Sequence, residues 1–241
     1  MNEPNTMARP SPSRPLLISF SGIDGAGKST QISLLVAALA AADVRVVRLV
    51  FWDNVVVLPQ FREAGSLMLL KGEKGVGTPE KPVRRRDKNV RTWYLTAFRF
   101  FIYLLDAAHL SLVIAKARNP LTEVVIFDRY LYDELANLPL ENFAARTYVR
   151  WLLCMIPRPD LGLVLDAEPE TACLRKPEYP VDFVHRHRKS YLTLASWATE
   201  MSVIAPGTPV EVQQRIQNAV RDRLPQRTAR LLDLAQVSPM L

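Results

Sequence analysis

The chain has 241 residues, of which 49% are hydrophobic and 23% charged, and it carries a formal net charge of +7 at pH 7 with a pI near 9.6. These values are those of a globular protein long enough to bury its own core, and they exclude a low-complexity or collagen-like chain. No uninterrupted apolar run approaches the ~18 residues that a membrane-spanning helix needs, so no membrane association is expected.

Apolar patterning predicts strands and helices that alternate along the chain. A run at 15–22 that ends in glycine is typical of a buried strand, and the Ala- and Leu-rich stretch 28–42 has helical spacing. Thr208, Pro209 and Glu211 form a capping-box pattern at the start of the last helix. Further strands are expected at 44–51, 123–128, 161–166 and 202–205, and further helices at 89–118, 142–156, 181–201 and 208–224. The alternation predicts a parallel sheet with helices on both faces.

Three segments fall outside this pattern. The Pro- and Ser-rich residues 1–14 predict a disordered tail, and 225–241 predict a C-terminal tail. The Gly/Pro-rich basic stretch 71–89 predicts a mobile loop. The remaining span, 15–224, is expected to form one domain.

The segment GIDGAGKS matches the pattern G-x-x-x-x-G-K-[ST] between a predicted strand and a predicted helix. Glycines allow the backbone to approach a phosphate closely, and successive N–H groups at a helix N-terminus attract an anion. Lys28 supplies positive charge for the β- and γ-phosphates, and the Ser29 hydroxyl is a hard oxygen ligand for Mg²⁺. The motif predicts a phosphate-binding loop for ATP and Mg²⁺ made of Gly22, Ile23, Asp24, Gly25, Ala26, Gly27, Lys28, Ser29 and Thr30.

Two strands are expected to end in aspartate. Asp128 closes the run VVIFD and would lie at the carboxyl end of a strand beside the loop, where a carboxylate can hold Mg²⁺ and its water shell. The alternative is that Asp128 caps the next segment. Asp166 ends LGLVLD in the same way, and for it strand-end turn chemistry is the favoured interpretation.

Cysteine and histidine indicate no metal site. Cys154 and Cys173 have no metal-ligand spacing, so we expect two reduced core thiols and a cytoplasmic protein. His185 and His187 are two positions apart on a predicted helix and therefore face apart, so they are not expected to share a metal ion.

Four segments, in order, resemble the thymidylate kinase family: GIDGAGKSTQ at 22–31, DRY at 128–130, PDLGLVLDAEPETACLR at 159–175 and FVHRHRKSYLTLA at 183–195. The resemblance covers most of 15–222 and is weakest over 52–92. It implies an α/β P-loop NTPase three-layer fold with about five parallel strands. It implies transfer of the ATP γ-phosphoryl group to a nucleoside monophosphate, with dTMP as the expected acceptor. It also implies a homodimer through the long apolar helices, although a buried monomer core would explain their apolarity equally well.

The resemblance assigns roles to residues that match its motifs. Asp24 would contact the substrate sugar, and Arg129 would bind the acceptor phosphate, to which its planar fork is suited. Because Gly25 stands where one subclass has arginine, a lid must supply the cation beside the transferring phosphoryl group. The candidates for this cation are Arg175, Lys176, Arg186 and Arg188, and Arg175 is the one assigned. With Lys28, Asp128 and Arg129 it completes the expected catalytic set.

This sequence departs from the family on the acceptor side. The family's R-E-P-G-G motif is absent, and Arg48 and Asp53 are the candidates to replace it. On the long helix, the family's phosphate-binding arginine aligns by local pattern with Arg99, next to Phe98 as a stacking group. By spacing it aligns instead with the region of Asp106, about two helical turns away.

The lid is the last departure. The segment 175–181 is short for a lid, and loop 71–89 with Arg84–Arg86 is either a partial replacement or a solvated linker. Two other functions stay open: a kinase for a deoxynucleoside or another small phosphorylated acceptor, and a non-catalytic ATP-binding module. Nucleic acid is not an expected partner, because no aromatic residues interleave with the basic cluster.

Overall fold

The computed structural model describes residues 14–57, 93–119 and 121–223. The predicted basic loop 71–89 with Arg84–Arg86, the tail 225–241 and residues 1–13 of the N-terminal tail lie outside the described residues.

A single parallel sheet of five strands organises the described part of the chain, in the order β2-β3-β1-β4-β5. The strands are β1 (Leu16–Ser21), β2 (Val46–Val50), β3 (Val124–Asp128), β4 (Leu161–Leu165) and β5 (Met201–Ile204). They are nearly continuous apolar runs, because helices cover both faces of a parallel sheet. The chain adds β2 and β3 on one side of β1 and β4 and β5 on the other. The topological switch point, where ligands bind in such folds, therefore lies at the carboxyl end of β1.

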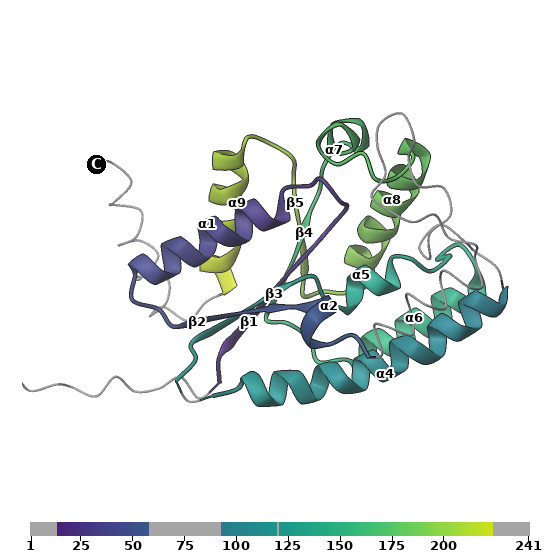
Figure 1. Ribbon diagram of the computed structural model, residues 1–241, viewed down its shortest axis with the longest axis horizontal. Coiled ribbons are helices and arrows are strands. Elements are labelled where there is room, and N and C mark those ends of the chain that lie inside the picture. Colours follow the sequence, from purple (N-terminus) through teal and green to yellow (C-terminus); the bar gives the residue numbers. More distant parts are fainter. Residues whose placement is uncertain (1–13, 58–92, 120, 224–241) are drawn as a thin grey trace, which may run out of the picture.

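Helices cover the sheet in two layers (Figure 1). One layer holds α1 (Lys28–Ala41) and α9 (Pro209–Arg223), and the other holds α4 (Trp93–Ala117), α5 (Leu131–Leu135), α6 (Phe143–Met155) and α8 (Val181–Trp197). The short helices are α2 (Phe51–Asn54), which follows β2, and α7 (Pro169–Arg175), which follows β4.

Two hydrophobic clusters fill the spaces between the layers. Ile18 and Phe20 of β1 are fully buried on the side of α1 and α9. Leu17, Val125 and Phe127 belong to the cluster on the side of α4. Strand residues alternate between these clusters because successive side chains point to opposite faces of a sheet. The prediction of a three-layer α/β fold is confirmed.

Several predicted boundaries differ from those observed. The strand expected to reach residue 51 ends at Val50, and Phe51 begins α2. The helix expected to reach residue 201 ends at Trp197, because Met201 pairs with Gly162 as the start of β5. The helices α5 and α7 were not predicted. Cys154 is exposed and Cys173 is half-buried, so the prediction that both are core thiols is wrong for Cys154; both are free cysteines.

Helix α4 corrects one expectation from the sequence. From Thr96 to Ala117 it is long and apolar enough, by length and composition, to cross a membrane. Core helices of soluble proteins pass the same test. In the structure Ile102, Tyr103 and Leu110 of α4 pack in the large cluster beneath the sheet. Its apolar character is therefore used at least partly in the core.

The N-cap of α6 offers a test of how local chemistry starts this helix. The Asn142 side chain accepts a hydrogen bond from the backbone N–H of Ala144 at 2.8 Å. Replacing a capping Asn by Ala removes this bond, so Asn142→Ala is expected to lower the free energy of unfolding by about 1 kcal/mol. Denaturant unfolding measures the change. The control Thr147→Ala, on the exposed surface of the same helix, should change it by less than about 0.5 kcal/mol, and an equal loss in both variants would contradict the capping role.

Candidate active site

The phosphate-binding loop joins β1 to α1, and its glycines are required by close contacts. Gly22 has φ 137°, and a Cβ built on it would lie 2.5 Å from the carbonyl oxygen of Leu165. Gly25 has φ 86°, and a Cβ there would lie 2.3 Å from the carbonyl oxygen of Ala172 on α7. The loop is thus pressed against β4 and α7. An arginine could not stand at residue 25 without moving this backbone.

Lys28 is held inside the loop. Its Nζ donates hydrogen bonds to the carbonyl oxygens of Gly22 and Ile23, both at 2.8 Å, and its side chain is only 7% exposed. Ser29 and Thr30 follow in the first turn of α1 and are exposed. One buried ammonium and two accessible hydroxyls therefore lie at the N-terminus of α1.

Asp128 lies at the same edge of the sheet. The parallel register pairs Asp128 with Phe20, two residues before Gly22. Its Oδ2 accepts a hydrogen bond from Nη2 of Arg48 on β2 at 2.6 Å. Arg48 therefore lies at the site, whereas Asp53, the other candidate to replace the missing motif, is exposed on α2. The N-cap of α5 is Tyr130, so Asp128 does not cap that helix.

Arg129 joins the end of β3 to the phosphate-binding loop. Its backbone is left-handed, with φ 69°, and its N–H donates to the carbonyl oxygen of Phe20 at 2.9 Å. Its guanidinium pairs with the carboxylates of Asp24 in the loop and of Asp133 on α5. Burial by itself would lower the pKa of Arg129, but Asp133 and Asp24 outweigh it and raise that pKa. The cation is therefore fixed in place and stays charged.

Asp133 holds Arg129 from α5, and the sequence did not reveal this contact. Its buried carboxylate accepts hydrogen bonds from Ser21 Oγ at 2.6 Å, from the Tyr130 N–H at 3.0 Å and from the Tyr191 hydroxyl at 2.8 Å, in addition to Arg129 Nη1 at 3.2 Å. Burial and then Asp133 raise the pKa of Tyr191, which keeps this hydroxyl a donor. An acid three positions after an N-cap residue is typical of a helix start, so Asp133 could have indicated the beginning of α5. No local pattern indicated that Tyr191 would bind it.

The four candidate lid cations separate into two groups. Arg175 donates from Nη1 to the carbonyl oxygen of Gly25 at 3.5 Å, and Lys176 Nζ lies 3.9 Å from Asp24. Arg188 instead binds both carboxylate oxygens of Asp166, at 2.6 and 2.7 Å. Arg186 lines a cleft between α6 and α8. The predicted short lid is the turn between α7 and α8, and it brings Arg175 and Lys176 to the loop.

The comparisons with known proteins agree with this geometry. A thymidylate kinase from Symbiobacterium thermophilum is 30% identical over 231 residues, which cover 88% of this chain and 95% of the relative. The chain belongs to the thymidylate kinase family. The prediction of the family is thereby confirmed.

Other thymidylate kinases are similar over different lengths. One from Xanthomonas euvesicatoria is 32% identical over 165 residues, but these cover 66% of this chain and only 60% of the relative. One from Legionella pneumophila is 26% identical over 86% of this chain and 94% of the relative. A solved thymidylate kinase structure from Candida albicans has a TM-score of 0.58 at 17% identity and covers 91% of this chain and 94% of its own, which supports the fold. No family model matches the chain.

Family membership leaves the acceptor residues of the long helix as predictions. Arg99 is buried, with 3% of its surface exposed, whereas Phe98 is 52% exposed. Asp106, two turns further on, is fully buried, and its Oδ1 accepts a hydrogen bond from the Val57 N–H at 2.8 Å. Arg99 and Asp106 thus both lie in the interior, and Phe98 projects from a different side of the helix.

The two histidines of α8 have separate environments. His187 is buried between the rings of Phe183 and Tyr191, at centroid distances of 5.2 and 4.9 Å. His185 is exposed, and its Nε2 lies 2.9 Å from Oε1 of Glu170. Within residues 14–57, 93–119 and 121–223, no group of three or more His, Cys, Asp or Glu residues is arranged to hold a metal ion.

The buried pair of Arg129 and Asp133 should contribute measurably to stability. Asp133→Asn keeps the shape of the side chain but removes the charge that faces the buried guanidinium. We expect it to lower the free energy of unfolding by about 3 kcal/mol, since breaking a buried ion pair is strongly destabilising. Denaturant unfolding checks this value. Asp182→Asn, an exposed acid on α8, is the matched control and should change stability by less than about 0.5 kcal/mol; similar losses in the two variants would remove the special role of Asp133.

Proposed function

We propose that this member of the thymidylate kinase family transfers the γ-phosphoryl group of ATP to a nucleoside monophosphate, with dTMP as the acceptor. The pairing of Arg129 with Asp24 carries the proposal, because it joins the expected acceptor cation to the donor loop. Phosphoryl transfer between two nucleotides depends on positioning and charge neutralisation, so donor and acceptor groups must meet at one point. The proposed kinase domain is 15–224.

The donor side is proposed to act through the loop. The β- and γ-phosphates of ATP would take the place of the carbonyl oxygens of Gly22 and Ile23 as partners of Lys28. The backbone N–H groups of the loop and the N-terminus of α1 would bind the same phosphates. Because these groups are already in place, little reorganisation is needed when the charge redistributes.

Magnesium is part of the proposal, since the donor set fits it. The exposed Ser29 hydroxyl and the Asp128 carboxylate are both hard oxygen ligands, and Mg²⁺ is commonly held by one or two such groups together with water and phosphate oxygens. When bound, Mg²⁺ would neutralise charge on the donor phosphates. Arg48 binds Oδ2 of Asp128 and so limits the orientations open to that carboxylate.

The acceptor is proposed to lie beside Arg129. A guanidinium has five N–H donors, so Arg129 can bind a phosphate while it stays paired with the carboxylate of Asp133. Asp24 would then accept from a sugar hydroxyl of the acceptor. Phe98 and Arg99 are proposed to contact the acceptor from α4. The dTMP assignment rests on the names of the relatives, which are thymidylate kinases.

Arg175 is the proposed cation at the transferring phosphoryl group. It contacts the loop at the Gly25 carbonyl oxygen and ends α7, whose backbone is pressed against the same glycine. From this position the guanidinium would neutralise charge on the phosphates bound by the loop. Arg188, by contrast, is bound to Asp166 and Glu168.

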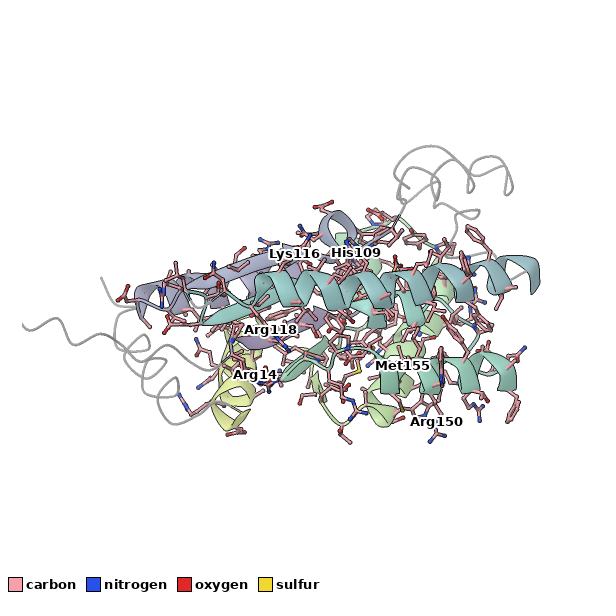
Figure 2. All side chains as sticks on the ribbon, turned by 90° about the horizontal axis from the view of Figure 1, so that it is seen from below. Arg14, His109, Lys116, Arg118, Arg150 and Met155 are labelled. Carbon is pink, nitrogen blue, oxygen red and sulfur yellow. The ribbon has the colours of Figure 1, made fainter. Side chains whose placement is uncertain are left out.

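A homodimer is proposed through α4 and α6. Exposed apolar side chains follow one another at helical spacing on both helices: Phe101, Leu104 and Leu112 on α4, and Phe143, Trp151 and Met155 on α6. The two helices lie side by side on one side of the molecule (Figure 2). Such a concentration of exposed apolar surface is typical of a protein interface.

The cytoplasm is the proposed location. Cys154 and Cys173 are free thiols, and an exposed free thiol suits a reducing compartment. Neither a membrane nor a nucleic acid is part of the proposal.

Kinase activity should depend on Lys28. Lys28→Ala removes the buried ammonium that would bind the donor phosphates, so we expect at least a ~100-fold loss of turnover. The measurement is coupled ADP release from ATP and Mg²⁺, with dTMP, dUMP, the other monophosphates and free deoxynucleosides as acceptors. Lys116→Ala, at the exposed C-terminal end of α4, is the charge-matched control.

The same panel tests the acceptor. A strong Lys28-dependent response to dTMP is the expected result. ADP release only with free deoxynucleosides would mean that the acceptor is a deoxynucleoside, and the proposed ATP site would stand. ATP binding without ADP release for any acceptor would indicate a non-catalytic module and would overturn the proposal.

Arg175 should act on the transition state more than on binding. Arg175→Ala is expected to lower kcat about 100-fold, with a much smaller change in KM for ATP, since charge stabilisation is greatest in the transition state. Steady-state kinetics separate the two constants. Leu174→Ala, at an 86% exposed neighbouring position on α7, is the control and should leave both unchanged. A wild-type kcat in Arg175→Ala would transfer the role to Lys176 or another cation.

The dimer predicts a mass of about twice the 27.3 kDa of the chain. Trp151→Glu would place a charge in the apolar interface, which like any unpaired buried charge is costly, so we expect a shift to monomers. Sedimentation velocity measures the mass. Leu192→Glu, at a 37% exposed position on α8, is the control and should stay dimeric; a wild-type protein that is monomeric at micromolar concentration would exclude the interface.

A further inference from the structure

The cleft between α6 and α8 that Arg186 lines lies apart from the phosphate-binding loop. It has a volume of about 420 Å³, within the usual range for small-molecule sites. Three segments line it: the turn before α6, α6 itself and the outward side of α8. The lining residues are Leu140, Glu141, Arg146, Arg186, Lys189, Ser190, Thr193 and Trp197.

The cleft concentrates positive charge that is not neutralised. Three of its side chains are cationic, Arg146, Arg186 and Lys189, and one is acidic. No carboxylate in the described part of the chain lies within 4.0 Å of the charged nitrogens of these three cations. Elsewhere on α8 the pattern is different, because Arg188 binds Asp166 and Glu168. Unpaired cations around a concave surface attract a small anion.

The walls of the cleft suit a phosphate-bearing ligand. The Nε of Arg146 donates to the carbonyl oxygen of Leu140 at 3.4 Å, so its two Nη atoms stay available to a ligand. The hydroxyls of Ser190 and Thr193 line the same cleft and can rotate from their present backbone acceptors toward an anion. Trp197 adds an apolar wall, and the guanidinium of Arg150 lies 5.9 Å from its ring centroid. Arginine, lysine and hydroxyl groups are the usual ligands of phosphate oxygens.

This cleft is separate from the phosphate-binding loop. Positions 186, 189, 190, 193 and 197 recur on one side of α8, whereas Arg188 is about 200° away around the helix axis and reaches the end of β4. The buried rings of His187 and Tyr191 lie on the helix surface that faces the core. A ligand in the cleft would therefore contact α8 from outside while the loop lies beyond its inner side.

We propose that the cleft between α6 and α8 is a second binding site for a small phosphate-bearing anion, independent of the ATP site. The phosphate can belong to a free nucleotide or to an inorganic polyphosphate, and in both cases Arg146, Arg186 and Lys189 bind it. The cleft is too small for a nucleic-acid duplex. Its cations line one concave surface and do not form the extended basic groove that binds a nucleic-acid backbone.

The test uses tripolyphosphate as the probe and the full chain carrying Lys28→Ala, so that binding at the phosphate-binding loop is weakened from the start. Isothermal titration calorimetry is expected to detect one remaining site. Adding Arg146→Ala and Lys189→Ala should raise its Kd at least about ten-fold, because two charge-assisted contacts are lost. Adding Lys116→Ala and Arg118→Ala instead, at the C-terminal end of α4 (Figure 2), removes the same charge elsewhere and should change Kd less than about two-fold.

The comparison variants keep the proposal falsifiable. Equal losses with the two charge-matched pairs, or no binding in the Lys28→Ala protein, would overturn it. Arg186→Ala alone is a milder change that can be used if the double variant folds poorly, which circular dichroism reports.

A second comparison identifies the source of the phosphate. If ATP binds more tightly than tripolyphosphate, and Trp197→Ala removes this difference in affinity, the ligand is a nucleotide. Equal affinities would identify the phosphate chain alone, and both results support the site. A single-stranded DNA oligonucleotide whose binding depends on Lys116 and Arg118 as strongly as on the cleft would overturn it in favour of a diffuse basic surface. None of these measurements reads turnover, so failure here is distinct from failure of the proposed kinase function.

Discussion

The interaction on which the site depends is the buried contact between Arg129 and two carboxylates. The left-handed backbone of Arg129 turns the chain at the end of β3, and its N–H is bound to the strand carbonyl of Phe20. This geometry directs the guanidinium between Asp24 and Asp133. A positive charge this far removed from water is tolerated only with such partners. The same carboxylate of Asp133 also accepts from Ser21 and Tyr191, so β1, α5 and α8 are tied to one point.

The phosphate-binding loop is positioned by contacts of a different kind. Gly22 and Gly25 bring its backbone against the carbonyl oxygens of Leu165 and Ala172, where a side chain has no room. These contacts place the loop against α7 and so determine which cation can reach it. Arg175, at the end of α7, lies next to the loop, and Lys176 follows it in the short turn before α8. The contact that leaves no room for a side chain at residue 25 thus involves α7, the helix that also carries Arg175.

Local patterns in the sequence predicted the parts of this protein that depend on neighbours in the chain. Strand and helix periodicity gave the five strands and the long helices, and the loop motif gave the residues from Gly22 to Thr30. The resemblance added Asp24 and Arg129, which the structure brings into contact. What was missed depends on distant partners. Tyr191 reaches Asp133 across 58 residues and Ser21 reaches it across 112, and neither distance leaves a local signal. The short helices α5 and α7 also escaped, because five and seven residues are too few to establish a period.

The arrangement of charge on α8 bears on how a net charge of +7 should be interpreted. On the side toward the strand ends, Arg188 is neutralised by two acids, and such a pair mainly fixes geometry. On the opposite side, Arg186 and Lys189 have no acidic partner within the described residues, and Arg146 faces them from α6. A paired arginine contributes little to the field outside the protein, whereas unpaired cations around a hollow add their fields inside it. Within the described residues, the positive charge is therefore unevenly distributed over the surface of α8. Part of it is concentrated in a cleft where a small anion can approach several cations at once, and this concentration, rather than the sum of the charges, is what points to a ligand.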